Sequence, residues 1–405
     1  VRYGCPKARF YQASCYDPRT RVLTTAGLKT YTEVKVGDSV FSVDVRTNQM
    51  EVKQVLRVIR STFDGEMVRI RGKRLNFMVT PNHKMLLHGK NGLFYSAAGD
   101  DIPGFEDFYP RKSSVKLPNP VWCGEKRKSV RLSEVAPCGV PTNATRNLIT
   151  EIPTTDLLWI MGLYIGDGYF SPTKKDVDVS GTREEFTRVR GRFGHFVSGV
   201  KDRKTSYPSH NVYFAVWEED KSRKALIAWL RKYEIEFCES REWVRFSSFP
   251  LGALFRTCGV SSQTKHIPAW VLPLATEHLC GLFDGLIGSD GHMKINRKSF
   301  TYTTTSPVLA QQVIELGVKL GLRCSVDKSP PSTPSIKGRM VNGNGAFQIH
   351  ISKNHMRRPI TIYPKHITRE RYKGEVWCLE VEDNHNFLVE RGGKYAFCGN
   401  SSEMF

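Results

Sequence analysis

Long apolar runs are absent from this sequence of 405 residues, and none approaches the length of about 18 residues that a membrane-spanning helix needs. The first residues also lack the basic lead and apolar core of a secretory signal. We therefore expect a soluble, cytoplasmic protein without a membrane partner. The 10 cysteines are scattered and include no C-x-x-C pair, which argues against a zinc framework and against a dense disulfide scaffold.

Acidic residues are few relative to basic ones, with 40 aspartates and glutamates against 60 lysines and arginines. The formal net charge of +20 favours a polyanion as partner, because such a surface attracts phosphate groups, although charge alone names no target. With 40% hydrophobic residues, a chain of 405 residues can form two or three packed domains.

Short β-rich segments recur between residues 21 and 88, with glycines near the breaks between them. The clearest are residues 40–43, 55–59, 67–70 and 77–80. The β pattern returns at residues 375–381, 387–389 and 395–397. We expect strands from both ends of the chain to build one all-β domain, with the middle of the chain inserted into one of its loops.

The inserted middle contains an internal duplication. Residues 157–168 and 277–291 both have a helical pattern that ends in Asp-Gly, and aligning Asp167 with Asp290 also aligns Gly162 with Gly285. A further helical stretch follows each copy, at residues 223–233 and 307–320. Each copy therefore predicts a mixed α/β half-domain. Residues 89–150 are rich in proline, and their basic cluster at 125–128 is either solvated or in contact with a phosphate backbone.

These features together resemble an intein that carries a LAGLIDADG homing endonuclease. The resemblance rests on Cys15, Thr80-Pro81-Asn82-His83, residues 383–387, Asn400-Ser401 and the paired segments 162–168 and 285–291. It implies a multidomain fold, in which an all-β Hint (hedgehog/intein) splicing domain is interrupted by a pseudo-twofold α/β LAGLIDADG endonuclease. The expected parts are an N-extein flank (1–14), splicing domain (15–110), connector or small DNA-contacting subdomain (111–150), endonuclease (151–362), splicing domain (363–400) and C-extein flank (401–405).

In the splicing reaction that the resemblance implies, the Cys15 thiol attacks the Ser14 carbonyl and Ser401 then takes over the acyl group. Asn400 finally cyclises onto its own carbonyl and releases the segment 15–400. An acyl shift at Ser401 restores a normal peptide bond.

Four further residues resemble the family's helpers in splicing. Thr80 and His83 resemble the pair that polarises the first scissile amide, although a histidine at a strand end is more often structural. His385 resembles the histidine of the last steps. Cys378 stands where the family often has an acidic residue, and it could equally be an inward-facing strand residue.

Gly399 departs from the family, which usually has histidine before the terminal asparagine. Asparagine cyclisation then lacks its nearest acid–base group. The sequence alone therefore predicts that Gly399→His speeds cleavage at the C-terminal junction.

For the endonuclease, the resemblance implies that Asp167 and Asp290 meet at the helix ends and hold Mg²⁺ against phosphates of double-stranded DNA. Lys265 resembles the basic residue that assists cleavage, with a solvated surface lysine as the alternative. We expect a monomer. The candidate DNA contacts, each of which could equally be a solvated charge, are Arg183, Arg188, Arg190, Arg192, Lys294, Arg297 and Lys298.

The flanks resemble a host protein. Residues 9–14 joined to residues 401–405 are similar to the active-site segment of nucleotide-sugar dehydratases of the GDP-mannose 4,6-dehydratase type. This resemblance implies that Ser401 is the host's catalytic hydroxyl residue and Glu403 its acid/base, so that the host stays inactive until the insertion leaves.

Two other interpretations remain open. The duplicated region could bind DNA without cutting it, on a β domain that only supports it. The β domain could also process itself in the manner of hedgehog proteins, which cleave without ligating, but Asn400-Ser401 argues against this because ligation needs both residues.

Overall fold

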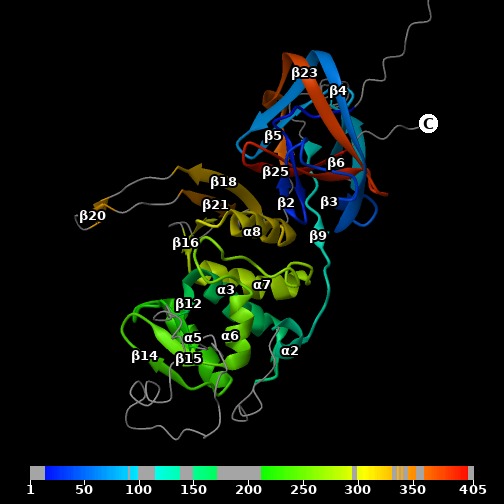
Figure 1. Cartoon of the computed structure of the whole chain (residues 1–405). Helices are drawn as coiled ribbons and strands as arrows, with labels where there is room; N and C mark the ends of the chain where they lie inside the picture. The colour runs from blue at the N-terminus through cyan, green and yellow to red at the C-terminus, as the bar shows by residue number, and fades with distance from the viewer. Residues whose placement is uncertain are drawn as a thin grey trace, which may run out of the picture.

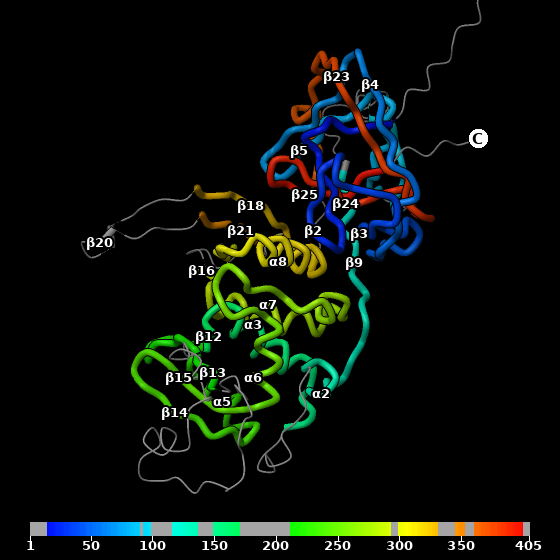
Figure 2. The backbone as a smooth tube through the Cα atoms, viewed as in Figure 1, coloured from blue at the N-terminus to red at the C-terminus, as the bar shows by residue number. Residues whose placement is uncertain are grey.

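The computed structural model describes residues 14–89, 92–98, 115–136, 149–170, 211–293, 299–330, 335–336, 339–340, 345–352 and 360–399. Two parts are evident in the backbone trace, one made of strands and one in which helices and strands alternate (Figures 1 and 2). We refer to them as the β domain and the duplicated domain. No helix among the described residues is long and apolar enough to cross a membrane.

The β domain combines strands from both ends of the chain, as expected. Its main sheet has the order β23-β4-β3-β1-β24-β25, with β2, β5 and β9 paired at its sides. Figure 1 accordingly shows blue and red strands side by side. The strands are β1 (Arg21–Thr24), β2 (Gly27–Lys29), β3 (Ser39–Asp44), β4 (Gln49–Gly72), β5 (Leu75–Val79), β9 (Val121–Trp122), β23 (Ile367–Val381), β24 (Asn386–Arg391) and β25 (Lys394–Gly399).

One strand differs from the expected pattern. Residues 55–59 and 67–70, predicted as two strands, lie in the single strand β4, and Gly65 between them lies opposite Tyr372 of β23. The antiparallel partner supplies ladder hydrogen bonds along this length, so the glycine is accommodated within a strand and no turn forms. The prediction of a break there was wrong because the partner lies some 300 residues away, with Ile70 opposite Ile367.

A smaller sheet of order β22-β8-β6-β7 completes the β domain. It consists of β6 (Lys84–Gly89), β7 (Gly92–Ala97), β8 (Val115–Lys116) and β22 (Thr361–Ile362). β8 lies in the segment predicted as a connector and β22 in the segment predicted as endonuclease. Both nevertheless extend this sheet, and β9 of the main sheet also lies beyond residue 110, so the β domain reaches residue 122 on one side and residue 361 on the other, past the predicted boundaries at 110 and 363.

The duplication is confirmed by topology, because each half carries a four-stranded sheet of equivalent order, β12-β13-β15-β14 and β16-β17-β21-β18. The first half contains α3 (Thr154–Asp167), β12 (Gly168–Phe170), β13 (Asn211–Phe214), α5 (Lys221–Lys232), β14 (Phe237–Glu239), β15 (Val244–Ser247) and α6 (Phe249–Arg256). The second contains α7 (Thr276–Gly288), β16 (Gly291–Met293), β17 (Ser299–Thr304), α8 (Pro307–Lys319), β18 (Arg323–Ser329) and β21 (Ala346–Ser352). The remaining short elements are β10 (Ser129–Arg131), α2 (Leu132–Val135), β11 (Glu151–Pro153), β19 (Ser335–Ile336), β20 (Arg339–Met340) and the 3₁₀ turn η2 (Pro364–His366).

Helices α3 and α7 lie against each other at the centre of the duplicated domain, at a distance that only small residues permit. A Cβ atom at Gly162 would lie 2.4 Å from the Leu282 carbonyl oxygen, and one at Gly285 would lie 2.1 Å from the Trp159 carbonyl oxygen. These glycines let the two backbones touch. The contact brings the C-terminal ends of α3 and α7 together.

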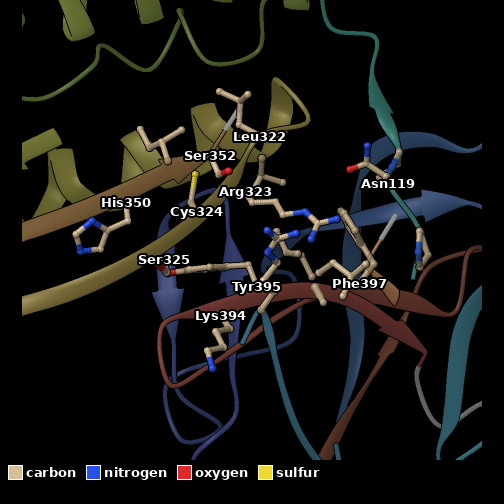
Figure 3. Close-up of a pocket in the computed structure, with 18 of the residues that line it drawn as sticks. Asn119, Leu322, Arg323, Cys324, Ser325, His350, Ser352, Lys394, Tyr395 and Phe397 are labelled. Atoms are coloured by element: carbon tan, nitrogen blue, oxygen red, sulfur yellow. The ribbon is translucent and has the colours of Figure 1, made fainter. Parts of the chain in front are cut away.

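The two domains meet around a cavity of about 340 Å³ (Figure 3). Residues of β18 and β21, among them Arg323 and Ser352, face Tyr395 and Phe397 of β25 across it. No aspartate or glutamate of the described chain lines the cavity, whereas Lys73, Arg74 and Arg323 do. These side chains make the junction electropositive. Burial, with the charge of Arg74 beside it, lowers the pKa of Arg323 to about 10.

Candidate functional site

The peptide bond between Ser14 and Cys15 lies in a closed polar site of the β domain. The Cys15 amide donates to Thr80 Oγ1 at 2.9 Å, and the Thr80 amide donates to the Cys15 carbonyl at 3.0 Å. Ser14 Oγ donates to the Asn82 carbonyl at 3.0 Å. The turn after β5 therefore forms hydrogen bonds with the residues on both sides of this peptide bond.

His83 lies at the end of the same turn and is fully buried. Burial lowers its pKa to about 3, and the Ser14 backbone acts in the opposite direction. His83 Nε2 lies 3.3 Å from Cys398 Sγ, and its Nδ1 is buried and makes no hydrogen bond to the described residues. A neutral imidazole with one uncommitted nitrogen can exchange a proton with a neighbouring amide or thiol.

Cys15 is also fully buried, and burial raises the pKa of its thiol to about 12. The group is therefore a thiol at neutral pH. Reactive cysteines usually have a lowered pKa, so a nucleophilic Cys15 has to give up its proton during attack. His83 is a neutral base in the same turn as Thr80, which binds the Cys15 amide.

The end of β25 lies at the same place. Tyr16 forms an isolated bridge with Trp377 of β23, and its hydroxyl donates to the Gly399 carbonyl at 2.7 Å. Cys398 is fully buried between His83 and Met85, with its Sγ 3.4 Å from Met85 Sδ. The two ends of the segment predicted to be excised thus meet within one core.

Two of the remaining predicted splicing residues lie on either side of this region. Cys378 is fully buried in β23, next to Trp377, which pairs with Tyr16. His385 lies in the turn before β24 with φ of +50°, and its side chain is exposed. Since Asn386 pairs with Gly399, His385 is next in register to the junction, but it makes no hydrogen bond to another described residue. Asn400, Ser401 and Glu403 lie outside the described residues, as do the flanking residues 1–13.

The second candidate site lies where α3 and α7 end. Asp167, Asp290 and Lys265 line one cavity of about 410 Å³. Burial, together with the charge of Asp290, raises the pKa of Asp167 to about 7. The pKa of Asp290 is also raised, because the surrounding protein partly desolvates its carboxylate, although the residue as a whole is exposed. Two carboxylates that resist ionisation together are suited to binding a cation.

Lys265 is buried beside these carboxylates, so the alternative of a solvated surface lysine is wrong. Its ammonium group donates to the carbonyls of Tyr164 at 2.5 Å and Gly168 at 2.8 Å, at the C-terminal end of α3. Burial lowers its pKa to about 7, partly offset by Cys258 and both aspartates. The lysine therefore caps the C-terminal end of α3. Because its pKa is about 7, it can hold or release a proton near neutral pH.

A metal ion at this site would have few protein ligands. Within the described residues, no group of three or more His, Cys, Asp or Glu side chains is placed to hold one. The oxygen donors of Asp167 and Asp290 fit a hard cation such as Mg²⁺, which takes one or two carboxylates and completes its shell with water and phosphate. The candidate DNA contacts Arg183, Arg188, Arg190, Arg192, Lys294, Arg297 and Lys298 all lie outside the described residues.

Sequence reasoning missed Tyr16, Cys398 and Tyr302. Tyr302 pairs with Gly291, its hydroxyl is fully buried without a hydrogen bond in the described part, and both aspartates add to burial in raising its pKa. The matching position of the first half, opposite Gly168, is Phe214. Comparing the two repeats would have revealed this difference, whereas the contacts of Tyr16 and Cys398 leave no local pattern.

No family model matches the chain. Among curated proteins, an ATP-dependent DNA helicase of Thermococcus kodakarensis is 21% identical over an alignment of 440 residues, covering 93% of this chain and 35% of the helicase. An iron-sulfur cluster assembly SufBD family protein of Mycobacterium leprae is 24% identical, covering 79% of this chain and 33% of its own length. A DNA polymerase of Pyrococcus horikoshii is 25% identical, covering 64% and 18%. The chain spans about a third or less of the length of these relatives.

Solved structures with partial likeness include an intein and a nuclease. A DnaB intein from Synechocystis is 13% identical, covers 26% of this chain and 70% of its own, and has a TM-score of 0.20. The homing endonuclease I-DmoI in complex with DNA and Mn is 13% identical, covers 49% of this chain and 90% of its own, and has a TM-score of 0.30. Each likeness covers less than half of the chain.

Proposed function

We propose that the chain excises itself from a host protein by protein splicing, with Cys15, Ser401 and Asn400 as its reacting residues. One observation carries the proposal: the bond before Cys15 and the carbonyl before Asn400 are bound in one buried site, by Thr80 and by Tyr16. These two points are almost the whole chain apart. An intramolecular reaction between the ends requires such a meeting.

In the first step, the Cys15 sulfur bonds to the Ser14 carbonyl carbon, and the bond from that carbon to the Cys15 nitrogen breaks. Thr80 holds that nitrogen through its hydroxyl. His83, neutral and fully buried, accepts the thiol proton and returns it to the departing nitrogen. Ser401 then takes the acyl group from Cys15, and the proton of its hydroxyl returns to the sulfur.

In the last step, the Asn400 side-chain nitrogen bonds to the Asn400 carbonyl carbon, and the bond to the Ser401 nitrogen breaks. One proton of the side-chain amide passes to the departing amine. The acyl group on the Ser401 oxygen then moves to this amine and forms an ordinary peptide bond. Every proton lost in one step is recovered in the same step, so no external reactant is needed.

The curated relatives support an inserted element. Their printed activities differ, since they are a helicase, an iron-sulfur assembly protein and a polymerase, yet each matches 64% to 93% of this chain with 18% to 35% of its own length. A segment shared by proteins of unrelated function contributes none of their named activities. It is expected instead to have an activity of its own.

We propose in addition that the duplicated domain cuts double-stranded DNA. Asp167 and Asp290 would hold Mg²⁺, which when bound supplies a positive charge for the phosphate oxygens of the two strands. Lys265, with its pKa lowered to about 7, would give or take a proton beside the scissile phosphate. DNA binding without cleavage is the second candidate, favoured by the electropositive residues Lys73, Arg74 and Arg323 at the domain junction.

The splicing proposal is tested by fusing one tagged protein before Val1 and another after Phe405. Splicing yields a ligated product of both tags and a free segment of residues 15–400, whereas a stable fusion contradicts it. Cleavage without ligation would instead support the hedgehog-type alternative. For the nuclease, DNA that encodes residues 1–14 joined directly to residues 401–405 is incubated with the protein and Mg²⁺. Double-strand breaks support cleavage, and a shifted but intact DNA band supports binding alone.

A further inference from the structure

The hydrogen bond between Tyr16 and Gly399 connects two residues that are 383 positions apart. Its acceptor, the Gly399 carbonyl, belongs to the peptide bond that leads into Asn400. Its donor belongs to the residue directly after Cys15. One side chain therefore joins the segment of the first nucleophile to the backbone of the last.

Backbone hydrogen bonds and ring packing both hold Tyr16 in place. It is fully buried, its amide donates to the Trp377 carbonyl at 2.8 Å, and its carbonyl accepts from the Trp377 amide at 3.0 Å. Its ring packs against His83 and Phe387, with centroid distances of 4.4 and 5.6 Å. A hydroxyl fixed in this way is preorganised for its acceptor.

Gly399 itself cannot provide a helping side chain. A Cβ atom at this position would lie 2.0 Å from the Lys84 carbonyl oxygen, which is backbone and cannot rotate away. The histidine expected from the family therefore has no room in this site. This contact contradicts the expectation that Gly399→His speeds cleavage, and we now expect that substitution to displace the end of β25.

His385, the other residue expected to help, is exposed and makes no hydrogen bond within the described chain. The buried hydroxyl of Tyr16 is the side-chain donor that binds the Gly399 carbonyl at 2.7 Å. It therefore contacts the peptide group that joins Gly399 to Asn400.

We propose that Tyr16 is the positioning residue for the cyclisation of Asn400, in place of the absent histidine. By holding the Gly399 carbonyl, the hydroxyl fixes the plane of the peptide group that joins residues 399 and 400. With this peptide plane fixed, we expect the Asn400 side-chain amide to approach the Asn400 carbonyl in a productive orientation more often. Tyr16 neither gains nor loses a proton in the step. This inference rests on the proposed splicing function.

The test compares Tyr16→Phe with the wild-type full chain, tagged at both ends. Two rates are measured: thiol-induced cleavage between Ser14 and Cys15, and conversion of the branched intermediate into the free segment with a cyclic imide end. We expect the first rate to change less than about twofold, because Phe keeps the packing. We expect the second to fall about tenfold, as the loss of one buried hydrogen bond implies, so that the branched intermediate accumulates.

A tyrosine elsewhere in the β domain provides the matched control. The Tyr372 hydroxyl also donates to a backbone carbonyl, that of Glu375 at 2.6 Å, but on the exposed β4–β23 ribbon. Tyr372→Phe should therefore leave both rates unchanged. Replacing Tyr16 by para-aminophenylalanine keeps a donor at the same place and should restore most of the cyclisation rate, which a purely structural role would not require.

Several results would overturn the inference. These are an unchanged cyclisation rate in Tyr16→Phe, an equal fall in both rates, or no rescue by para-aminophenylalanine in a protein that still undergoes thiol-induced cleavage. If Tyr16→Phe does not fold, the para-aminophenylalanine variant alone decides, through the ratio of its two rates. Failure of the splicing proposal is distinct, because the wild-type chain would then release no segment with a cyclic imide end.

Discussion

Burial acts in opposite ways on the two candidate sites. In the β domain it moves titratable groups away from neutrality, with the pKa of Cys15 raised to about 12 and that of His83 lowered to about 3. In the duplicated domain it moves them toward neutrality from both sides, since Asp167 rises and Lys265 falls to about 7. The same physical cause therefore gives one site of fixed protonation and one that titrates.

The two proposed functions differ in where the substrate comes from. Self-excision takes the chain itself as substrate, which agrees with a closed site in which Cys15 and His83 have no exposed surface. DNA would come from outside, which agrees with the open cavity of about 410 Å³ that Asp167 and Asp290 line. A closed site can rely on proton transfers within it, whereas an open site has to compete with solvent for protons and cations.

Cys15→Ala should have the largest effect and should separate the two sites. This substitution removes the nucleophile, so splicing and thiol-induced cleavage should both disappear, a loss of more than about a thousandfold. DNA cleavage should be unchanged, because Cys15 belongs to a buried cluster of the β domain that is separate from the one containing α3 and α7. Gel analysis of products and a plasmid cleavage assay measure the two. The control is Cys123→Ser at an exposed cysteine. Residual ligation in Cys15→Ala would refute the assignment of the nucleophile.

Asp290→Asn should have the reverse effect. Loss of one carboxylate halves the charge that holds the cation, so DNA cleavage should fall by at least about a hundredfold, while splicing continues. The matched control is Asp284→Asn, an exposed aspartate on α7. If Asp290→Asn cleaves DNA as fast as the control does, the cation site lies elsewhere.

Arg391→Ala tests how the splicing site is held. Arg391 and Asp17 form a buried ion pair at 2.7 Å, with 5% and 4% of their side chains exposed. Asp17 lies two residues after Cys15. Removing the cation leaves a buried carboxylate uncompensated, which costs about 3–5 kcal/mol of unfolding free energy. We expect a lower melting temperature and loss of splicing, with DNA cleavage retained below that temperature. Arg46→Ala, at a side chain that is 91% exposed, should change neither.

The smallest expected effects are those of pH. Because the pKa of Asp167 is raised, the carboxyl is protonated below about pH 7 and ionises above it. Cation binding must displace this proton, so the Mg²⁺ concentration for half-maximal cleavage should rise up to about tenfold per pH unit below pH 7 and level off above it. Formation of the branched intermediate without added thiol should stay nearly constant from pH 6 to 9, since the transfer from Cys15 to His83 changes no net protonation.

Two outcomes of the pH experiment would contradict this explanation. A tenfold rise per pH unit in formation of the branched intermediate would show attack by a Cys15 thiolate formed with bulk solvent. A Mg²⁺ requirement that is independent of pH would show that Asp167 is ionised throughout.

The sequence predicted those parts of both sites that depend on local spacing. Thr80 and His83 share one turn, and their placement beside Cys15 agrees with the sequence prediction. The closeness of α3 and α7 follows from glycines within single helices, such as Gly162 and Gly285. Patterns of this kind can be recognised within one turn or one helix, even when the contact they allow is with another element.

The rest depended on contacts between distant residues. Tyr16 acquires its acceptor from a strand that begins more than 370 residues later, and the lack of space at Gly399 comes from the Lys84 carbonyl. The single strand β4 likewise depends on β23. Neither the composition nor the periodicity around these residues contains such information, because the register between the ends of the chain is set only by the folded sheet.

The mass of the intact products after expression tests the central claim most directly. If Cys15 and Asn400 define the excised segment, the spectrum contains residues 15–400 less one water, from the cyclic imide, together with a ligated product of residues 1–14 and 401–405. A spectrum that contains only the unprocessed chain of 405 residues, or fragments cut at other positions, would contradict it.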